Sequence, residues 1–269
     1  MPPSLSMSPR KPYPSLGKCI YCLKKFQPIE LKKEHIVPLG LNGIWVIKEA
    51  TCEPCRRLTS EGYENDAMQT SFLLPRLMLE LKRRKKTAKK LPIAYSEYTA
   101  HLASVGHLDP LELELSQYPP IVQFPDFKNA AGKLIGIDHT NMFNGEIRFW
   151  FRNVSDLINY RSNPPPGKTS IREVTKPGAM ATTVAKIAYC FAVAERGLEA
   201  FHGDEIRQLL RCERDDVFNF FGATLTGESL PSGRLHWIAT RERGSFMTVI
   251  VHLFSSLGAP TYEVVVGSI

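Results

Sequence analysis

Two pairs of cysteines near the N-terminus are the residues whose spacing predicts chemistry most directly. Cys19 and Cys22 form one Cys-x-x-Cys pair, and Cys52 and Cys55 form the second. A turn with this spacing points two thiolates at one ion, so two such turns supply the four sulfur ligands of a tetrahedral zinc site. Redox-active dithiols are the alternative, and one such motif is plausible where two are not. The pattern predicts a structural zinc ion, which stabilises a small module and performs no chemistry itself.

An acid–histidine motif lies between the two cysteine pairs. Glu34-His35 is followed by Ile36-Val37-Pro38 and then by the glycine-containing segment 39–43. This arrangement resembles the HNH endonuclease family, which has a ββα-metal active site and whose members often carry the motif between two cysteine pairs. The resemblance covers about residues 19–66, and the acid-His-Ile-x-Pro segment is its most specific part.

The resemblance implies a metal-dependent endonuclease that hydrolyses phosphodiester bonds in DNA. His35 takes the role of general base, because imidazole titrates near neutral pH. Glu34 helps to hold a divalent cation, Mg²⁺ or Mn²⁺, that offsets negative charge on the scissile phosphate. Adjacent residues of a regular strand face opposite ways, so a bulge or loop is required for both side chains to reach one site.

The segment after the second cysteine pair departs from the family's pattern. Many members place Asn or His directly after the last cysteine, whereas this chain has Arg56, a cation that cannot ligate a metal. If a helix starts near residue 55, then Arg57, Glu61 and Glu64 share one face. Glu64 is then the candidate second ligand of the divalent cation, with Glu61 behind it. Arg56 and Arg57 are candidates for phosphate contacts.

The residues leave other classes of function open. The missing Asn or His favours a catalytically inactive, zinc-containing module that binds nucleic acid, and a protein-interaction adaptor with a purely structural zinc is the third class. The expected partner is DNA, although the sequence does not distinguish DNA from RNA. It also does not indicate a cleavage specificity, a choice between nicking and double-strand breaks, or an oligomeric state.

A basic run follows the cysteine-containing segment. Residues 82–90 contain seven positively charged side chains and no acidic one. Because the net charge of the whole chain is +7, the net charge of the remaining residues is zero. Such a run can neutralise several phosphates in a salt-sensitive and sequence-independent way, although it also suits a solvated helix face. The predicted phosphate-contacting cations are Lys82, Arg83, Arg84, Lys85, Lys86, Lys89 and Lys90.

The predicted organisation is α+β, with a small zinc-stabilised ββα module followed by a larger α+β domain of unknown role. We expect a flexible tail over residues 1–16, the nuclease-like module over 17–70, a basic helical linker over 71–92 and the second domain over 93–269. The linker is predicted to be one helix over 71–90 that ends in the basic run and is stopped by Pro92.

Within the second domain, helices are predicted over 93–118, 179–200, 203–211 and 215–221. Strands are predicted over 121–127, 133–139, 146–151, 235–240, 246–254 and 261–266. No stretch of eighteen apolar residues is free of charge and the first sixteen residues lack an apolar core, so we expect a cytoplasmic protein without a membrane span. Among weaker candidates, His236 and His252 are expected to be core or edge residues, and Cys190 is expected to be buried and inert.

Overall fold

The computed structural model describes residues 12–81, 90–95, 111–114, 121–139, 145–151, 171–172, 176–225 and 234–269. Helices and strands occur together, which confirms the α+β class. The C-terminal part contains an antiparallel sheet with the order β8-β11-β10-β9. Its strands are β8 (Phe221–Ala223), β9 (His236–Arg243), β10 (Phe246–Leu253) and β11 (Tyr262–Ser268). Gly244, whose φ is +58°, provides the left-handed turn between β9 and β10.

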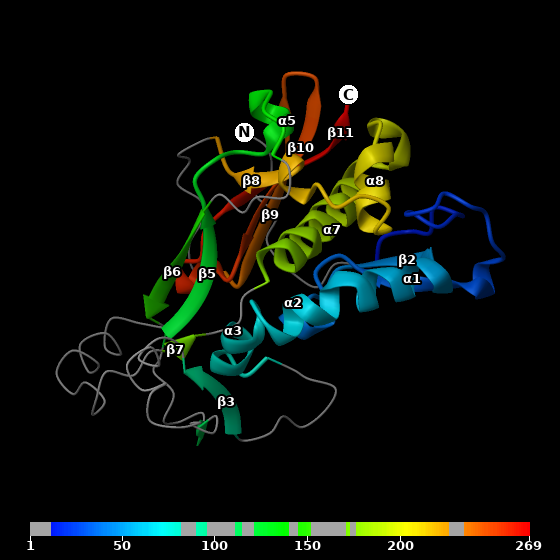
Figure 1. Ribbon diagram of the computed structural model, residues 1–269. Helices are drawn as coiled ribbons and strands as arrows, with labels where there is room; N and C mark the ends of the chain where they lie inside the picture. Colours follow the sequence, from blue (N-terminus) through cyan, green and yellow to red (C-terminus); the bar gives the residue numbers. More distant parts are fainter. Residues whose placement is uncertain are drawn as a thin grey trace.

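A long helix, α7 (Pro177–Arg196), packs against this sheet and lies at the centre of the structure (Figure 1). Pro177 is in its first turn, where the N–H that proline lacks would have no helical partner, and Gly197 follows its last residue. From residue 180 to 193 every residue except Thr182 is buried. By length and composition α7 could cross a membrane, but 72% of its most apolar window is buried inside the structure, as in the core helix of a folded domain.

The N-terminal part packs against α7, which lies between most of this part and the sheet in Figure 1. It is a hairpin followed by helical segments, with the 3-10 turns η1 (Pro28–Glu30) and η2 (Leu39–Leu41) before and after the first strand. Its other elements are β1 (Leu31–His35), β2 (Val46–Cys52), α1 (Glu53–Thr59), the π-helical turn η3 (Ser60–Glu64), α2 (Asn65–Gln69) and α3 (Leu73–Met78). The strand–strand–helix order follows the cysteine pairs: the first pair precedes β1, and the second spans the junction of β2 and α1.

The remaining elements form smaller sheets and short helices. One sheet has the order β4-β3-β7, and β5 and β6 form a separate two-stranded antiparallel sheet. These strands are β3 (Lys90–Tyr95), β4 (Leu111–Glu114), β5 (Ile121–Phe127), β6 (Gly145–Phe151) and β7 (Ile171–Arg172). The short helices are α5 (Gly132–Ile135), η5 (Leu198–Ala200), α8 (Asp204–Leu210), η6 (Val217–Asn219) and η7 (Ser255–Leu257).

The predicted basic helix over 71–90 is wrong in its extent. Helix α3 ends at Met78, and Glu80 has a φ of +51°, which no α-helix accommodates. Lys90 already belongs to β3, and Pro92 lies inside that strand instead of stopping a helix. Position 92 is paired with Glu112 of β4, whereas the described residues of β7 pair with residues 94 and 95, beyond the proline. Residues 82–89 lie outside the described part of the chain.

Two other predicted elements have the wrong type. The segment 93–118, expected to be helical, contributes strand residues to β3 and β4 wherever it is described. The segment 133–139, expected to be a strand, begins with helix α5, which Gly136 ends in a left-handed conformation with φ +68°. Residues 215–221 form only the 3-10 turn η6 before β8 begins. The predicted strands that became β5, β6, β9, β10 and β11, and the helices that became α7 and α8, are confirmed.

One buried apolar cluster extends from the cysteine-containing segment into the C-terminal part of the chain. Trp45 in the hairpin lies 5.7 Å from Phe191 of α7, measured between ring centroids. Tyr13, which falls in the segment expected to be a flexible tail, is hydrogen-bonded through its backbone to Val46 and Lys48 on β2. The described residues therefore place the hairpin and α7 on a shared core.

His236 connects the sheet to the turn that follows β1. It is 1% exposed, its Nδ1 accepts the backbone N–H of Phe254 at 3.2 Å, and its Nε2 lies 2.6 Å from the carbonyl oxygen of Leu41. Because an amide N–H can only donate, Nε2 carries the ring proton and the imidazole is neutral. The expectation that His236 is a core residue is confirmed, and burial lowers its pKa to about 4.

This pKa predicts a loss of stability in acid. The unfolded chain has the ordinary histidine pKa of about 6.5, so it binds a proton between pH 6.5 and 4 that the folded chain does not. The free energy of unfolding should fall by about 3 kcal/mol through this window relative to a His236→Gln variant. Urea titrations of both proteins at pH 7 and pH 4 measure the difference, because every other histidine titrates in both. If the free energies of unfolding of the two proteins changed equally between pH 7 and pH 4, the lowered pKa of His236 would be contradicted.

Candidate zinc centre and adjoining carboxylate–lysine cluster

The four cysteines of the two pairs converge on one point. Their sulfur atoms all lie within 4.8 Å of one another, and Cys22 Sγ lies 3.9 Å from Cys52 Sγ. Sulfurs placed tetrahedrally at about 2.3 Å from a zinc ion lie about 3.8 Å apart, so this separation suits zinc. None of the four forms a disulfide. The structure therefore supports the prediction that Cys19, Cys22, Cys52 and Cys55 can bind one metal ion.

Local backbone geometry positions the cysteine pairs. In the first turn, the N–H of Cys19 donates to the carbonyl of Lys24, and Leu23 takes a left-handed conformation with φ +59° that reverses the chain. The second pair uses the end of β2, where Cys52 is the N-cap of α1 and Cys55 lies one turn inside the helix. The N–H of Ile20 donates to the carbonyl oxygen of Ala50 in β2, and this hydrogen bond holds the first cysteine turn next to the second cysteine pair.

The electrostatics of the cluster favour a cation. A hydrogen bond with the Cys55 side chain lowers the pKa of Cys19 to about 4, and burial raises the pKa of Cys52 to about 11. The hydrogen bond thus favours a negatively charged sulfur at Cys19, whereas burial favours thiols that keep their protons, as at Cys52. A soft ion that prefers sulfur, of which zinc is the common example, would displace those protons and satisfy all four ligands.

The acid–histidine motif lies at the end of β1, next to a bulge. Residues 32 and 34 pair with Thr51 and Ile47, so β2 contains two more residues than β1 in this stretch, and Glu49 has a φ of +45°. The expected irregularity therefore lies just before the motif. Glu34 is 7% exposed and turns inward, whereas His35 is partly exposed.

Lys186 of α7, which no sequence motif indicated, is the partner of Glu34. Its ammonium group forms an ion pair with Glu34 Oε1, donates to the carbonyl oxygen of His35 at 2.8 Å, and lies 3.2 Å from Glu64 Oε1. Its side chain is 2% exposed. Burial acts to lower the pKa of Lys186, but the two carboxylates outweigh burial and hold it above the ordinary value, so the group is charged. The sequence feature that could have indicated a buried ion pair is that Lys186 is the single charged residue in the apolar stretch 180–193.

Glu64 reaches this lysine because the helix widens before it. The π-helical turn η3 breaks the α-helical spacing, so Glu61 stays on the surface and pairs with Arg57 at 3.5 Å, while Glu64 faces inward. The expected shared face of Arg57, Glu61 and Glu64 is therefore wrong for Glu64. Gly62 permits the turn to approach the segment that follows α8, because a Cβ there would lie 2.8 Å from Cys212 Sγ.

The predicted cationic residues are distributed differently. Arg56 is exposed and forms a two-point ion pair with Glu53, with distances of 2.7 and 2.5 Å. Arg57 is also exposed, in its pair with Glu61. Lys82, Arg83, Arg84, Lys85, Lys86 and Lys89 lie outside the described residues, and Lys90 is placed only through its backbone in β3.

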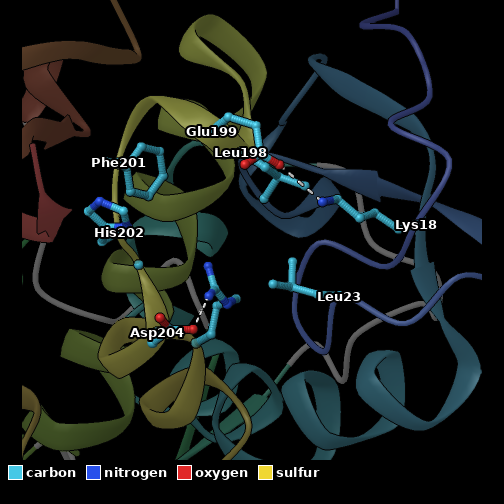
Figure 2. A pocket seen from close by; sticks show the side chains of 9 residues that line it. Lys18, Leu23, Leu198, Glu199, Phe201, His202 and Asp204 are labelled. Atoms are coloured by element: carbon cyan, nitrogen blue, oxygen red, sulfur yellow. Dashed lines mark hydrogen bonds and ion pairs between the residues drawn. The ribbon is translucent and has the colours of Figure 1, made fainter.

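A small pocket lies between the first cysteine turn and the segment that joins α7 to α8 (Figure 2). Lys18 and Glu199 form an ion pair at 3.2 Å on its wall, and Arg207 pairs with Asp204. Phe201 and His202 line the pocket from the segment that joins α7 to α8. Its lysine and arginine are thus already matched by carboxylates, so the pocket provides no uncompensated charge for an ionic ligand.

A scan of protein-family models, a search of curated proteins and a search of solved structures each find no match to this chain. Similarity therefore assigns neither a family nor an activity. The two clusters described above are the features from which a function has to be inferred.

The cysteine cluster predicts a zinc content that depends on each ligand. Protein purified with zinc in the medium should contain about one zinc ion per chain, and Cys52→Ser should lose it and melt at a lower temperature. Elemental analysis and thermal melting measure both effects. Cys212→Ser is the matched control, since Cys212 is an exposed thiol outside the cluster and should keep the zinc. Full zinc retention by Cys52→Ser would contradict the site.

Proposed function

We propose that residues 19–66 form an HNH-like ββα module that hydrolyses phosphodiester bonds in nucleic acid, with DNA as the expected substrate. The observation that carries the proposal is the order of elements: two cysteine pairs that meet at one point enclose a hairpin followed by a helix, with Glu34-His35 at the end of the first strand. This is the order that the family's ββα-metal site requires. The four cysteines would hold structural zinc, which supports the module without reacting.

In this proposal His35 acts as the general base. A neutral imidazole at the end of β1 accepts a proton from the attacking water, which then forms the new bond to phosphorus while the leaving oxygen departs with the cleaved strand. The hydrogen bond from Lys186 to the carbonyl oxygen of His35 fixes the backbone that carries the imidazole. Arg56 can contribute charge to the phosphate, because its exposed pair with Glu53 stabilises the fold little and is readily exchanged.

The divalent cation of the family does not fit between Glu34 and Glu64. The ammonium of Lys186 lies within reach of both carboxylates and of the carbonyl oxygen of His35, where Mg²⁺ or Mn²⁺ would have to bind. This observation favours a second candidate function, a zinc-containing module that binds nucleic acid without cleaving it. The two candidates differ in the need for His35.

A plasmid-nicking assay separates cleavage from binding. The assay is run with Mg²⁺, with Mn²⁺ and without either ion. Wild-type protein should nick the plasmid, and His35→Ala should nick it more slowly by about a hundredfold or more, because the general base is lost. His202→Ala is the matched control, since it removes an exposed histidine outside the proposed site. Equal nicking by wild type and His35→Ala, or no nicking by the wild type in any condition, would reject hydrolysis.

Binding itself should depend on the basic run. If Lys85 and Lys86 each contact a phosphate, then Lys85→Gln/Lys86→Gln should reduce the slope of log K against log salt by about 2, whatever the DNA sequence. Lys24→Gln/Lys25→Gln removes the same charge from two exposed lysines at the first cysteine turn and should leave the slope unchanged. Fluorescence anisotropy with a labelled duplex at several salt concentrations gives both slopes. No binding by the wild type at low salt would leave only the protein-interaction class.

A further inference from the structure

The Glu34–Lys186–Glu64 cluster has the composition of a cation site in which the cation is part of the chain. An ammonium group has three donors, and three oxygens surround this one: carboxylate oxygens of Glu34 and Glu64 and the carbonyl oxygen of His35. Two carboxylates and a backbone carbonyl are also the ligands that hard divalent cations select. The same oxygens that would coordinate a metal therefore coordinate Lys186.

We infer that Lys186 is the resident cation of this cluster, and that it excludes Mg²⁺ and Mn²⁺ from Glu34 and Glu64. A divalent ion bound to these carboxylates would lie close to the ammonium nitrogen, and two like charges at that separation in a buried site repel strongly. The Lys186 side chain cannot readily move into solvent to make room for a metal ion, because it is 2% exposed and its backbone lies in the middle of the buried helix α7. This exclusion of divalent ions by Lys186 does not depend on whether the protein cleaves nucleic acid.

The contacts on each side of the lysine strengthen the inference. Glu34 comes from β1, Glu64 from the π turn and Lys186 from α7, so the ammonium joins three elements that are far apart in the sequence. Glu64 Oε1 accepts no well-aligned hydrogen bond from the described residues although it lies 3.2 Å from the ammonium. This oxygen keeps free acceptor capacity, so the carboxylate pair could still coordinate a metal ion if the ammonium were removed.

Removal of the ammonium should convert the cluster into a divalent-cation site. Lys186→Met keeps a side chain of similar length without charge, and the two carboxylates then lack a counter-ion. We expect the zinc-loaded variant to bind about one additional Mn²⁺ per chain and to melt at a higher temperature when Mn²⁺ is added. Wild type should show neither effect. Electron paramagnetic resonance of free Mn²⁺ and thermal melting measure the two properties without any nuclease substrate.

Two further variants identify the ligands and test the role of charge. Lys186→Met/Glu34→Gln should lose the added Mn²⁺ site, since one carboxylate is gone. Lys186→Gln keeps an amide that can donate to the carboxylates, and it replaces Lys186→Met if the methionine variant does not fold; it too should gain Mn²⁺ binding. Zinc content and circular dichroism establish that each variant is folded.

Two results would overturn the inference. One is stoichiometric Mn²⁺ binding by the wild type that Glu34→Gln abolishes, because the lysine would then not exclude the metal. The other is a folded, zinc-loaded Lys186→Met or Lys186→Gln protein that binds no additional Mn²⁺. Failure of the proposed nuclease activity looks different: no nicking in any condition, with Mn²⁺ binding still gained on loss of the lysine.

Discussion

A positive charge inside an apolar helix is the constraint on which the rest of the structure depends. Lys186 lies in the buried stretch of α7, where an unpaired ammonium would be very unfavourable, and Glu34 and Glu64 supply its counter-charges. Breaking such a buried pair by removing one partner typically costs about 3–5 kcal/mol, a large part of the roughly 5–15 kcal/mol that stabilises a domain. The hairpin and the π turn are therefore held to α7 by charge as well as by apolar packing.

Hydrogen bonds from the C-terminal part to turns of the N-terminal part add to this attachment. The hydroxyl of Tyr189 donates to the carbonyl of Ile20 at 2.5 Å, and Arg211 Nη1 donates to the carbonyl of Tyr21 at 2.6 Å. Both carbonyls belong to the first cysteine turn. A zinc ion bound there would consequently stabilise the contact with α7 and α8 as well as its own module.

Much of the fold could be predicted from local sequence pattern. The apolar runs of α7, β10 and β11 follow directly from the residues, since each of these elements buries a continuous run of side chains. The segment 71–90 could not be predicted in the same way. Its apolar and basic residues suit a helix, but the backbone leaves helical geometry at Glu80, and the pairing of Lys90 with Glu114 depends on a strand remote in sequence.

In the candidate sites, too, some features could be predicted from the sequence and others depend on the tertiary structure. The spacing of the four cysteines predicted that they converge where one metal ion could bind, because two tight turns with that spacing can supply four sulfur ligands. The sequence also placed Glu34 and Glu64 near each other, through the resemblance to a metal-dependent family. Only the tertiary structure decided which cation joins them, since Lys186 lies more than a hundred residues away and reaches them solely because α7 packs against the hairpin and the π turn.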